Sequence, residues 1–563
     1  MARDPAALVA QLETLNSLLV DLPPGPPIEG TADGLRARQR LADQIEDYIL
    51  PRLRNLDAPL LVGIGGSTGA GKSTITNSLI GHNVSAAGLL RPTTRMPVLV
   101  CHPDDERWFA EGEVLPDVMR STGSGIDPNA LAIHTSLRMH PGLAILDTPD
   151  IDSVEVANHE LAAQLLGAAD LWLFVTTAAR YADAVPWDYL RTARERSTGL
   201  AVVINRMPPD AAGPVADHFA AMLSEQGLAD TPLFTIDEVD LADGQLTEAQ
   251  LGALRSWIDG IAADAERRDA LVRSTIDGAI ASIPGRAERI AVAVDRQAAT
   301  IRALGTIADQ RFAEALQRVE RRLEGGNLLR SEVLTSWQDF VGTGQLMQSL
   351  QAGVSRLRDR LKSVFTGEPT ATIEMQGEVQ SSLAAAITEA ADAAADATVE
   401  AWDRAPAGHM VLGDDAWSMA RVGTDLPARI DAEIVQWQDY VLGLVRQQAE
   451  GKRLAARTIS LGINTIGVTL MVVIFAQTGG ITGGEVAVAG GTATLSQALL
   501  TAIFGENAVR DLARQSREDL VARVERLFAE EAGRFHDRLA GMPSIEHADA
   551  LRQTAGTVVE AAR

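Results

Sequence analysis

Residues 60–80 read LLVGIGGSTGAGKSTITNSLI, and the octapeptide GSTGAGKS at 66–73 decides the fold. It fits the pattern G-x-x-x-x-G-K-[ST]. An apolar run at 60–64, typical of a buried parallel strand, precedes it, and a helix-compatible segment at 74–80 follows it. Glycines let backbone N–H groups turn toward phosphate oxygens, and the start of the helix adds the positive end of its dipole. The stretch therefore predicts a nucleotide-binding phosphate loop.

The loop also carries the groups that a triphosphate and its metal ion require. Lys72 is placed to reach the β- and γ-phosphates and to stabilise charge during hydrolysis, and Ser73 is placed to ligate Mg²⁺. The predicted nucleotide ligands of the loop are Gly66, Ser67, Thr68, Gly69, Ala70, Gly71, Lys72, Ser73 and Thr74.

Two later segments complete the predicted metal site. In RPTTR at 91–95, between the helix and the second predicted strand, a threonine can complete Mg²⁺ coordination only while the γ-phosphate is present. Thr94 is the first choice and Thr93 the second. The apolar strand at 143–146 ends on Asp147, whose carboxylate would lie near the ion. The predicted metal ligands are Ser73, Thr94 and Asp147.

The base-reading element is incomplete. Asn205 and Arg206 directly follow the predicted strand at 201–204, but Pro208 stands where the pattern N-K-x-D has its aspartate. That aspartate accepts hydrogen bonds from guanine N1 and N2 and so rejects adenine. Asp210 could replace it if the chain bends inward at Pro208, and Arg206 could stack on the base. The residues of this element are therefore compatible with either GTP or ATP as the substrate.

The pattern of apolar residues predicts two kinds of architecture. Strand candidates at 97–101, 143–146, 171–175, 201–204 and 233–236 alternate with helix-compatible stretches, which predicts an α/β domain with a largely parallel sheet. After 262 the spacing becomes helical, and we expect a bundle and a mainly α protein. The expected domains are N-terminal helices joining the bundle at 1–57, a P-loop GTPase domain at 58–262, a helical bundle at 263–457, a hydrophobic hairpin at 458–505, and C-terminal helices returning to the bundle at 506–563.

Composition excludes several classes of protein. The chain has 563 residues, 46% hydrophobic and 22% charged, which suits several buried cores and excludes general disorder. A formal net charge of −25 argues against a general nucleic-acid binder. A single cysteine, Cys101, excludes an internal disulfide and zinc sites that need two cysteines. Because residues 1–10 also lack an export signal, we expect a cytoplasmic protein.

Residues 458–505 are the most apolar stretch, with one charged residue, Glu485. Two arms, 459–476 and 486–504, flank the turn-forming run GGITGG. Each arm is close to the roughly 20 residues that span a bilayer, and basic residues flank the hairpin. We expect a helical hairpin that inserts into the inner leaflet or re-enters; burial in a soluble bundle core is the alternative. The predicted membrane residues are Leu470, Val472, Val473, Ile474 and Phe475.

The segments GGSTGAGKST, RPTTR, LDTPD and VVINR, followed by a long helical region with an embedded apolar segment, resemble the bacterial dynamin-like GTPases. Residues 329–342 also look like helical-region sequence of a bacterial subgroup of this family. The resemblance implies a membrane-remodelling enzyme that uses GTP and Mg²⁺ and dimerises through its GTPase domains. It implies membrane lipids as partners, with a second copy or a sister protein, whereas the net charge of −25 leads us to expect no nucleic-acid partner.

The chain departs from the family at two positions. Thr68-Gly69 stands where eukaryotic dynamins have a Gln-Ser pair that positions water and a cation, so Thr68 occupies a catalytic position with a different side chain. The family's D-x-x-G becomes DTPD, so the amide that meets the γ-phosphate would come from Asp150. We therefore expect slow hydrolysis by the chain alone, or hydrolysis completed by a partner.

Together these features predict a GTPase that couples GTP binding and hydrolysis to membrane binding and to remodelling or stabilisation, at the inner face of the cell membrane. Two alternatives stay open. One is a soluble regulatory NTPase, able to use ATP, with the hairpin in its core. The other is a nucleotide-gated membrane scaffold with negligible turnover.

Overall fold

The computed structural model describes residues 5–85, 96–112, 114–115, 118–121, 130–151, 156–239, 241, 244–324, 369–449, 463–476, 500–501 and 503–563. The chain divides into two compact units. The first comprises Met1–Pro24, Glu29–Arg296 and Pro543–Arg563, and the second comprises Gly25–Ile28 and Gln297–Met542. The long helix α10 (Ala265–Glu324) contributes residues to both. The domain boundaries expected from the sequence stay a prediction.

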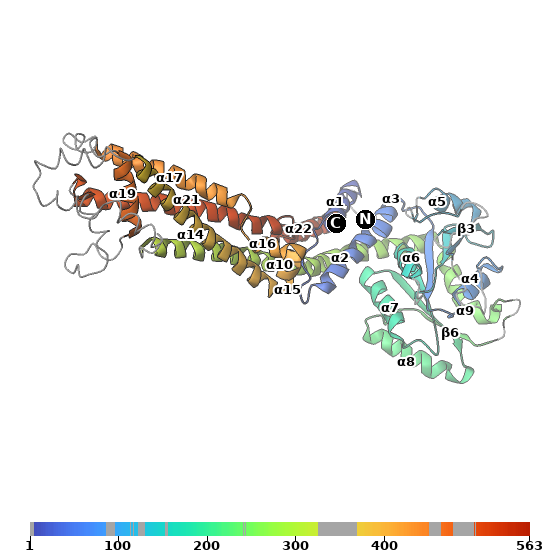
Figure 1. The fold of residues 1–563 in the computed structure, drawn as a ribbon. Coiled ribbons are helices and arrows are strands. Elements are labelled where there is room, and N and C mark those ends of the chain that lie inside the picture. The colour runs from blue at the N-terminus through green and yellow to red at the C-terminus, as the bar shows by residue number, and fades with distance from the viewer. Residues whose placement is uncertain are drawn as a thin grey trace, which may run out of the picture. The chain divides into compact units, whose positions relative to one another are not determined.

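A seven-stranded sheet forms the centre of the first unit (Figure 1). Its strands are β1 (Leu60–Gly66), β2 (Val98–Cys101), β3 (Ala132–Thr135), β4 (Leu143–Asp147), β5 (Leu171–Thr177), β6 (Gly199–Met207) and β7 (Leu233–Asp237). The order is β3-β2-β4-β1-β5-β6-β7, with β2 antiparallel to β4 and parallel to β3, and the other pairs parallel. The predicted largely parallel sheet is confirmed. The sequence did not predict β3, a four-residue edge strand whose His134 and Thr135 are exposed, because it lacks an apolar run.

Helices cover both faces of the sheet. Alternate residues of a strand point to opposite faces, so Leu60, Val62 and Ile64 pack in one core and Leu61 packs in the other. The first core includes residues of α4 (Lys72–Ile80), α9 (Glu248–Ala262) and α10. The second core includes residues of α5 (Glu106–Ala110), α6 (Val156–Gly167), α7 (Ala184–Arg196) and α8 (Ala212–Glu225). Burial on both faces explains why these strands are nearly continuous apolar runs.

Helices from both ends of the sequence also belong to the first unit. They are α1 (Pro5–Val20), α2 (Ala32–Gln44), a π-helical turn η1 (Ile45–Ile49), α3 (Leu50–Arg54) and α22 (Ile545–Ala562). The leucine stripe of α1 is buried, and the hydroxyl of Thr557 in α22 donates to Gln11 Oε1 of α1 at 2.9 Å. Arg552 of α22 binds Glu288 and Asp295 of α10, at 2.8 and 2.7 Å. The two ends of the chain are thus joined within one unit.

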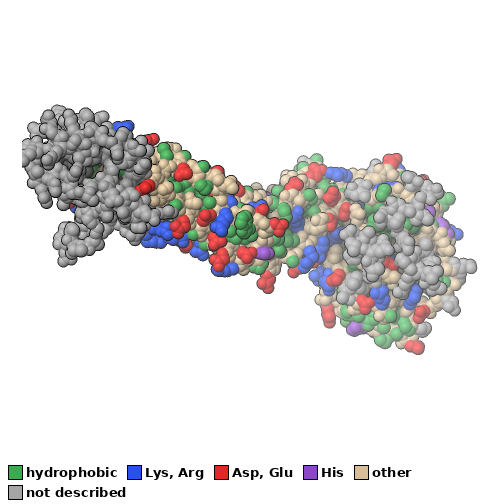
Figure 2. All heavy atoms as spheres, in the orientation of Figure 1, with side chains coloured by type: hydrophobic (Ala, Val, Ile, Leu, Met, Phe, Trp, Pro, Cys, Tyr) green, Lys and Arg blue, Asp and Glu red, His purple; other side chains and the backbone are tan. Residues whose placement is uncertain are grey.

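The second unit is a bundle of long helices, which run alongside one another in Figure 1. It contains the later part of α10 together with α14 (Pro369–Asp403), α15 (Pro406–Leu412), α16 (Ala416–Met419), α17 (Leu426–Ala449), α19 (Ile463–Ala476) and α21 (Glu506–Leu539). Two tryptophans fix helices to each other: Trp402 Nε1 donates to the carbonyl of Leu304 at 3.0 Å, and Trp437 Nε1 donates to that of Ser516 at 2.7 Å. Figure 2 shows acidic and basic side chains interspersed on the visible bundle surface. The predicted helical bundle is confirmed.

The helix α19 covers most of the first arm of the predicted hairpin, and it lies in the bundle core. Its side chains from Ile466 to Ile474 are buried, together with residues of α14, α17 and α21. Among the described residues, no helix has the length and apolar character needed to cross a bilayer.

A buried ion pair joins the N-terminal helices to the sheet. Arg52 Nε of α3 lies 3.0 Å from Asp170 Oδ1, and both side chains are less than 10% exposed. Arg52 also donates to the carbonyl of Ala58 at 2.9 Å, and Asp170 Oδ2 accepts from the amide of Leu61 at 2.8 Å. Burial raises the pKa of Asp170, and the charge of Arg52 opposes that rise.

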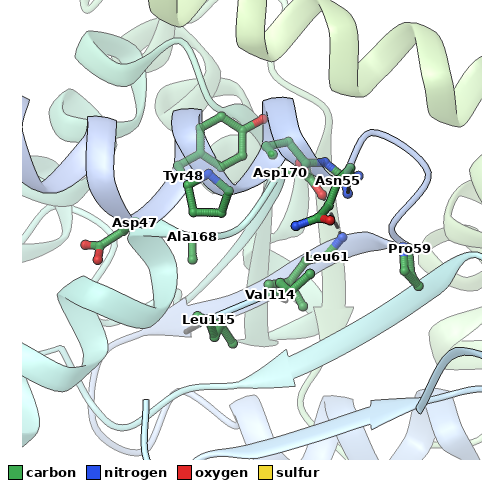
Figure 3. A pocket seen from close by; sticks show the side chains of 11 residues that line it. Asp47, Tyr48, Asn55, Pro59, Leu61, Val114, Leu115, Ala168 and Asp170 are labelled. Atoms are coloured by element: carbon green, nitrogen blue, oxygen red, sulfur yellow. Dashed lines mark hydrogen bonds and ion pairs between the residues drawn. The ribbon is translucent and has the colours of Figure 1, made fainter. Parts of the chain in front are cut away.

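A cavity of about 20 Å³, large enough for one water molecule, lies beside this pair. Figure 3 shows Asp47 and Tyr48 of η1 and Asp170, which precedes β5, around it. The pair lies at the amino end of β1 and β5, away from the phosphate loop. The Arg52–Asp170 ion pair therefore contributes to the stability of the fold.

We expect Arg52→Met to lower the free energy of unfolding by about 3 kcal/mol or more, because it leaves the Asp170 carboxylate buried without its counter-charge. Adding Asp170→Asn should restore part of that loss. The matched control is Arg54→Met, which removes an exposed ion pair with Glu13 at 2.5 Å and should cost about 1 kcal/mol or less. Urea unfolding followed by circular dichroism measures the differences; equal losses for Arg52→Met and Arg54→Met would contradict the assignment.

Candidate nucleotide-binding site

The phosphate loop joins the carboxyl end of β1 to the first residue of α4, as the motif predicts. Gly71 has a φ of +97°, and a Cβ there would lie 2.3 Å from Asn205 Nδ2. At Gly66 a Cβ would lie 2.0 Å from the carbonyl oxygen of Val175 in β5. Only glycine therefore allows the loop to pass this close to β5 and β6. All nine predicted loop residues, from Gly66 to Thr74, lie in this turn and the first turn of α4.

The ammonium of Lys72 is 4% exposed and faces the loop. Its Nζ donates to the carbonyls of Gly66 at 2.8 Å and Ser67 at 3.3 Å. It also forms an ion pair with the carboxylate of Asp150, which is 8% exposed. A buried ammonium needs a counter-charge, and here Asp150 supplies the negative charge that phosphate oxygens would supply. The sequence predicted a role for the Asp150 amide, but it gave no sign of this side-chain pairing.

Asp147 lies fully buried at the end of β4, beside Ile64 of β1. Its Oδ2 accepts a hydrogen bond from Ser85 Oγ at 2.6 Å, and its Oδ1 has no hydrogen-bond partner among the described residues. Burial raises the pKa of Asp147, while the hydroxyls of Ser85 and Ser73 and the charge of Lys72 oppose that rise. Ser85 was not predicted; the amide oxygen of Asn77 in α4 accepts its backbone N–H at 2.9 Å and holds it there.

These residues fit a Mg²⁺ site. Mg²⁺ is usually held by one or two carboxylates together with substrate phosphates, and a buried carboxylate oxygen without a partner is a suitable ligand. Ser73 and Asp147 would hold the ion. Within the described part of the chain, no group of three or more His, Cys, Asp or Glu side chains could hold a metal ion.

A second part of the site lies where β6 and β7 end. The pocket there has a volume of about 130 Å³. Its lining residues are Gly71, Thr74, Asn205, Arg206, Asp237, Glu238, Val239, Leu241 and Leu246. Asn205 Nδ2 donates to the carbonyl of Ala70 at 2.8 Å, so the predicted base-reading strand is tied directly to the phosphate loop.

Arg206 lines this pocket from an uncommon backbone conformation, with a φ of +51°. The β6–β7 pairing is irregular between Ile204 and Met207, and such bulges re-aim side chains near functional sites. Asp210 is an exposed residue in the 3-10 turn η3 (Pro209–Ala211) and is not among the lining residues. Asp237 and Glu238 line the pocket but were not singled out from the sequence. The sequence feature that could have identified them is a pair of adjacent acids at the carboxyl end of a predicted parallel strand, where ligands commonly bind.

Arg180, which follows β5, also contacts the phosphate loop. Its Nη1 donates to the carbonyl of Thr68 at 3.3 Å, and its Nε lies 3.1 Å from Asp183 Oδ2. The guanidinium therefore lies beside the loop position where the resemblance places a catalytic side chain.

The remaining predicted residues lie elsewhere. Thr93 and Thr94 fall outside the described residues, so the predicted γ-phosphate sensor stays a prediction. Leu470, Val472, Val473 and Ile474 are buried in the second unit. The backbone of Phe475 belongs to α19, and its side chain is outside the described part. A membrane role for these residues stays a prediction.

We expect Asp150→Asn to tighten the binding of a non-hydrolysable nucleoside triphosphate about tenfold, because the phosphates then displace no carboxylate from Lys72. Calorimetric titration in the presence of Mg²⁺ measures this. Asp183→Asn is the matched control, since it removes an exposed carboxylate near the loop without a contact to Lys72. Weaker binding by Asp150→Asn would show instead that this carboxylate assists the nucleotide.

No family model matches the sequence, and no curated protein matches it. Solved structures similar to it include Era in complex with MgGDPNP and nucleotides 1506–1542 of 16S ribosomal RNA, at 24% identity and a TM-score of 0.24, covering 36% of this chain and 56% of that one. A bacterial dynamin pair matches at 9% identity and a TM-score of 0.38, covering 95% of this chain and 96% of that one. LeoA, a bacterial dynamin GTPase from ETEC, matches at 12% identity and a TM-score of 0.23 over 100% of both chains. This chain spans little more than half of the length of the Era structure.

Proposed function

We propose that this protein is a Mg²⁺-dependent GTPase with the organisation of a dynamin-like protein. The observation that carries the proposal is the convergence of Lys72, Ser73 and Asp147 at the carboxyl ends of β1 and β4. Parallel strands bring these groups to one edge, where a triphosphate seated on the loop amides would contact Lys72 and its Mg²⁺ would contact Ser73 and Asp147.

Hydrolysis would be phosphoryl transfer from GTP to water. Lys72 would neutralise charge on the β- and γ-phosphates, and the loop amides would orient them. Bound Mg²⁺ supplies further charge neutralisation and orientation of the phosphates. Arg180 brings a second cation to the loop beside Thr68. The described site has no glutamine at the loop position where eukaryotic dynamins carry one, which supports slow hydrolysis by the chain alone.

We expect the purified full chain to release phosphate from GTP faster than from ATP, at about 10⁻² s⁻¹ or slower, the range of GTPases acting without an activating partner. Omitting Mg²⁺ or introducing Lys72→Ala should abolish release. Single-turnover phosphate release measures the rate. Turnover in the range of 1 s⁻¹ by the chain alone would contradict slow hydrolysis, and activity retained in Lys72→Ala would contradict the site.

We further propose that the apolar segment containing α19 contacts membrane in one nucleotide state. The seven described apolar side chains of α19 that are buried are Ile466, Val468, Leu470, Met471, Val472, Val473 and Ile474. Their burial is worth about 10 to 20 kcal/mol as an upper estimate. Lipid tails are as apolar as leucine, so transfer from bundle core to bilayer would cost little net free energy. A bias of a few kcal/mol from nucleotide binding could then decide the position of this helix.

Charge gives the membrane proposal less support than the sequence indicated. Of the basic residues that follow the hairpin, Arg510 pairs with Glu506 at 2.5 Å, and Arg514 pairs with Glu518 at 3.2 Å. These acids offset the attraction of the arginines to anionic lipid.

A disulfide lock tests whether α19 must leave the bundle. A Cβ on Gly467 would lie 3.4 Å from Leu442 Cγ of α17, so these two positions are adjacent and are the ones we choose for a Gly467→Cys/Leu442→Cys pair. With a non-hydrolysable GTP analogue, we expect the reduced double variant to float with liposomes and the oxidised one to remain unbound. Each single cysteine variant is a control that should float under both conditions.

Two outcomes of the lock experiment would contradict the membrane proposal. Equal flotation of both forms would place membrane contact elsewhere in the chain. No flotation in any nucleotide state, including by the wild type, would favour the soluble regulatory NTPase, which the burial of α19 supports. Assembly with a second copy or a sister protein, and a location at the inner membrane face, stay predictions.

A further inference from the structure

The carboxylate expected to recognise guanine is missing from its usual strand. Pro208 occupies the position, with an extended backbone at φ −63° and ψ 136°. The next acid along the chain, Asp210, lies exposed in η3 and does not line the pocket beside Asn205. If the protein selects guanine, another group must accept the two hydrogen bonds that distinguish guanine from adenine.

Two carboxylates reach the same pocket from the neighbouring strand. Asp237 is the last residue of β7, and its Cα pairs with that of Met207 in β6. The backbone N–H of Glu238 donates to the carbonyl of Met207 at 2.9 Å, which fixes the chain just beyond the strand. This register places Asp237 opposite Met207, two residues beyond Asn205, which touches the phosphate loop, and Glu238 follows Asp237. Both are exposed residues, so their oxygens are open to a ligand.

The rest of the pocket suits a purine ring. Gly71 and Thr74 form the side next to the phosphate loop, and Val239, Leu241 and Leu246 add apolar surface. Arg206 contributes a planar guanidinium, which stacks well on aromatic rings. Binding pockets for small molecules are commonly apolar with a few polar groups that fix orientation, and here those polar groups include two adjacent acids.

Guanine and its analogues differ in what a carboxylate can bind. Guanine presents N1–H and an N2 amino group as adjacent donors, and the two oxygens of a carboxylate can accept from both. Adenine has an acceptor at N1 and no amino group at C2, so a carboxylate there gains nothing and is left without partners. Xanthine has an oxygen at C2, which repels a carboxylate but accepts a hydrogen bond from the N–H of a side-chain amide.

We propose that the carboxyl end of β7, through Asp237 and Glu238, supplies the acceptor that selects guanine in this protein, in place of the missing aspartate of β6. This assignment rests on the proposed function as a GTPase, and it names the residues that set its substrate. It moves the specificity element to a different strand while Asn205 keeps its contact with the phosphate loop.

Competition titrations of the full chain with GDP, ADP and xanthosine diphosphate test the assignment, because diphosphates bind without turnover. The variants are Asp237→Asn and Glu238→Gln, with Asp210→Asn as the matched control. We expect at least one β7 variant to bind GDP about tenfold or more weakly and xanthosine diphosphate more tightly by a similar factor. Asp210→Asn should bind all three like the wild type. Tripolyphosphate, which has no base, should bind equally to every variant and so verifies that the loop is folded.

The outcomes separate failure of this inference from failure of the proposed function. Wild-type protein that binds ADP as tightly as GDP would overturn GTP as the substrate, whatever the variants do. Wild-type preference for GDP that survives in both β7 variants would overturn the inference alone. Loss of that preference in Asp210→Asn would assign the role to Asp210 instead.

Discussion

The buried ammonium of Lys72 is the constraint on which the nucleotide site depends. Because it is almost fully removed from water, it must face negative charge in every state of the protein. Here that charge comes from Asp150, in the segment that directly follows β4. A triphosphate on the loop would compete with Asp150 for the same cation. Binding of phosphates would thereby act on this segment through one side chain.

The parallel order of the strands explains why the chemistry gathers at one edge. The residues after β1, β4, β6 and β7 are far apart in the sequence, yet they surround one loop and one pocket. The hydrogen bond from Asn205 to Ala70 joins the phosphate and base parts of this site. The opposite end of the sheet carries the Arg52–Asp170 pair, which holds the N-terminal helices and takes no part in the chemistry.

Much of the fold followed from local sequence. The phosphate loop, the strand ending at Asp147 and the long helices were predicted correctly, since each depends on a motif or a periodicity within a few turns of chain. Strand β3 was not predicted, because an exposed edge strand of four residues has no apolar pattern. Ser85, Arg180, Asp237 and Glu238 were not assigned to the site. Ser85 and Arg180 contact residues 62 and 112 positions away along the chain, and the place of Asp237 and Glu238 depends on the register of another strand.

The sequence by itself determined that this chain has a glycine loop between a strand and a helix, that a largely parallel α/β unit carries this loop, and that helices make up the rest. These properties arise from backbone geometry and side-chain periodicity, which act over short stretches of chain. Only the tertiary structure decided that Asp150 neutralises Lys72, that the acids of β7 enter the pocket beside β6, and that α19 is buried among α14, α17 and α21. Each of these depends on which distant surfaces meet, and an apolar helix satisfies the hydrophobic effect equally well in a protein core or in lipid.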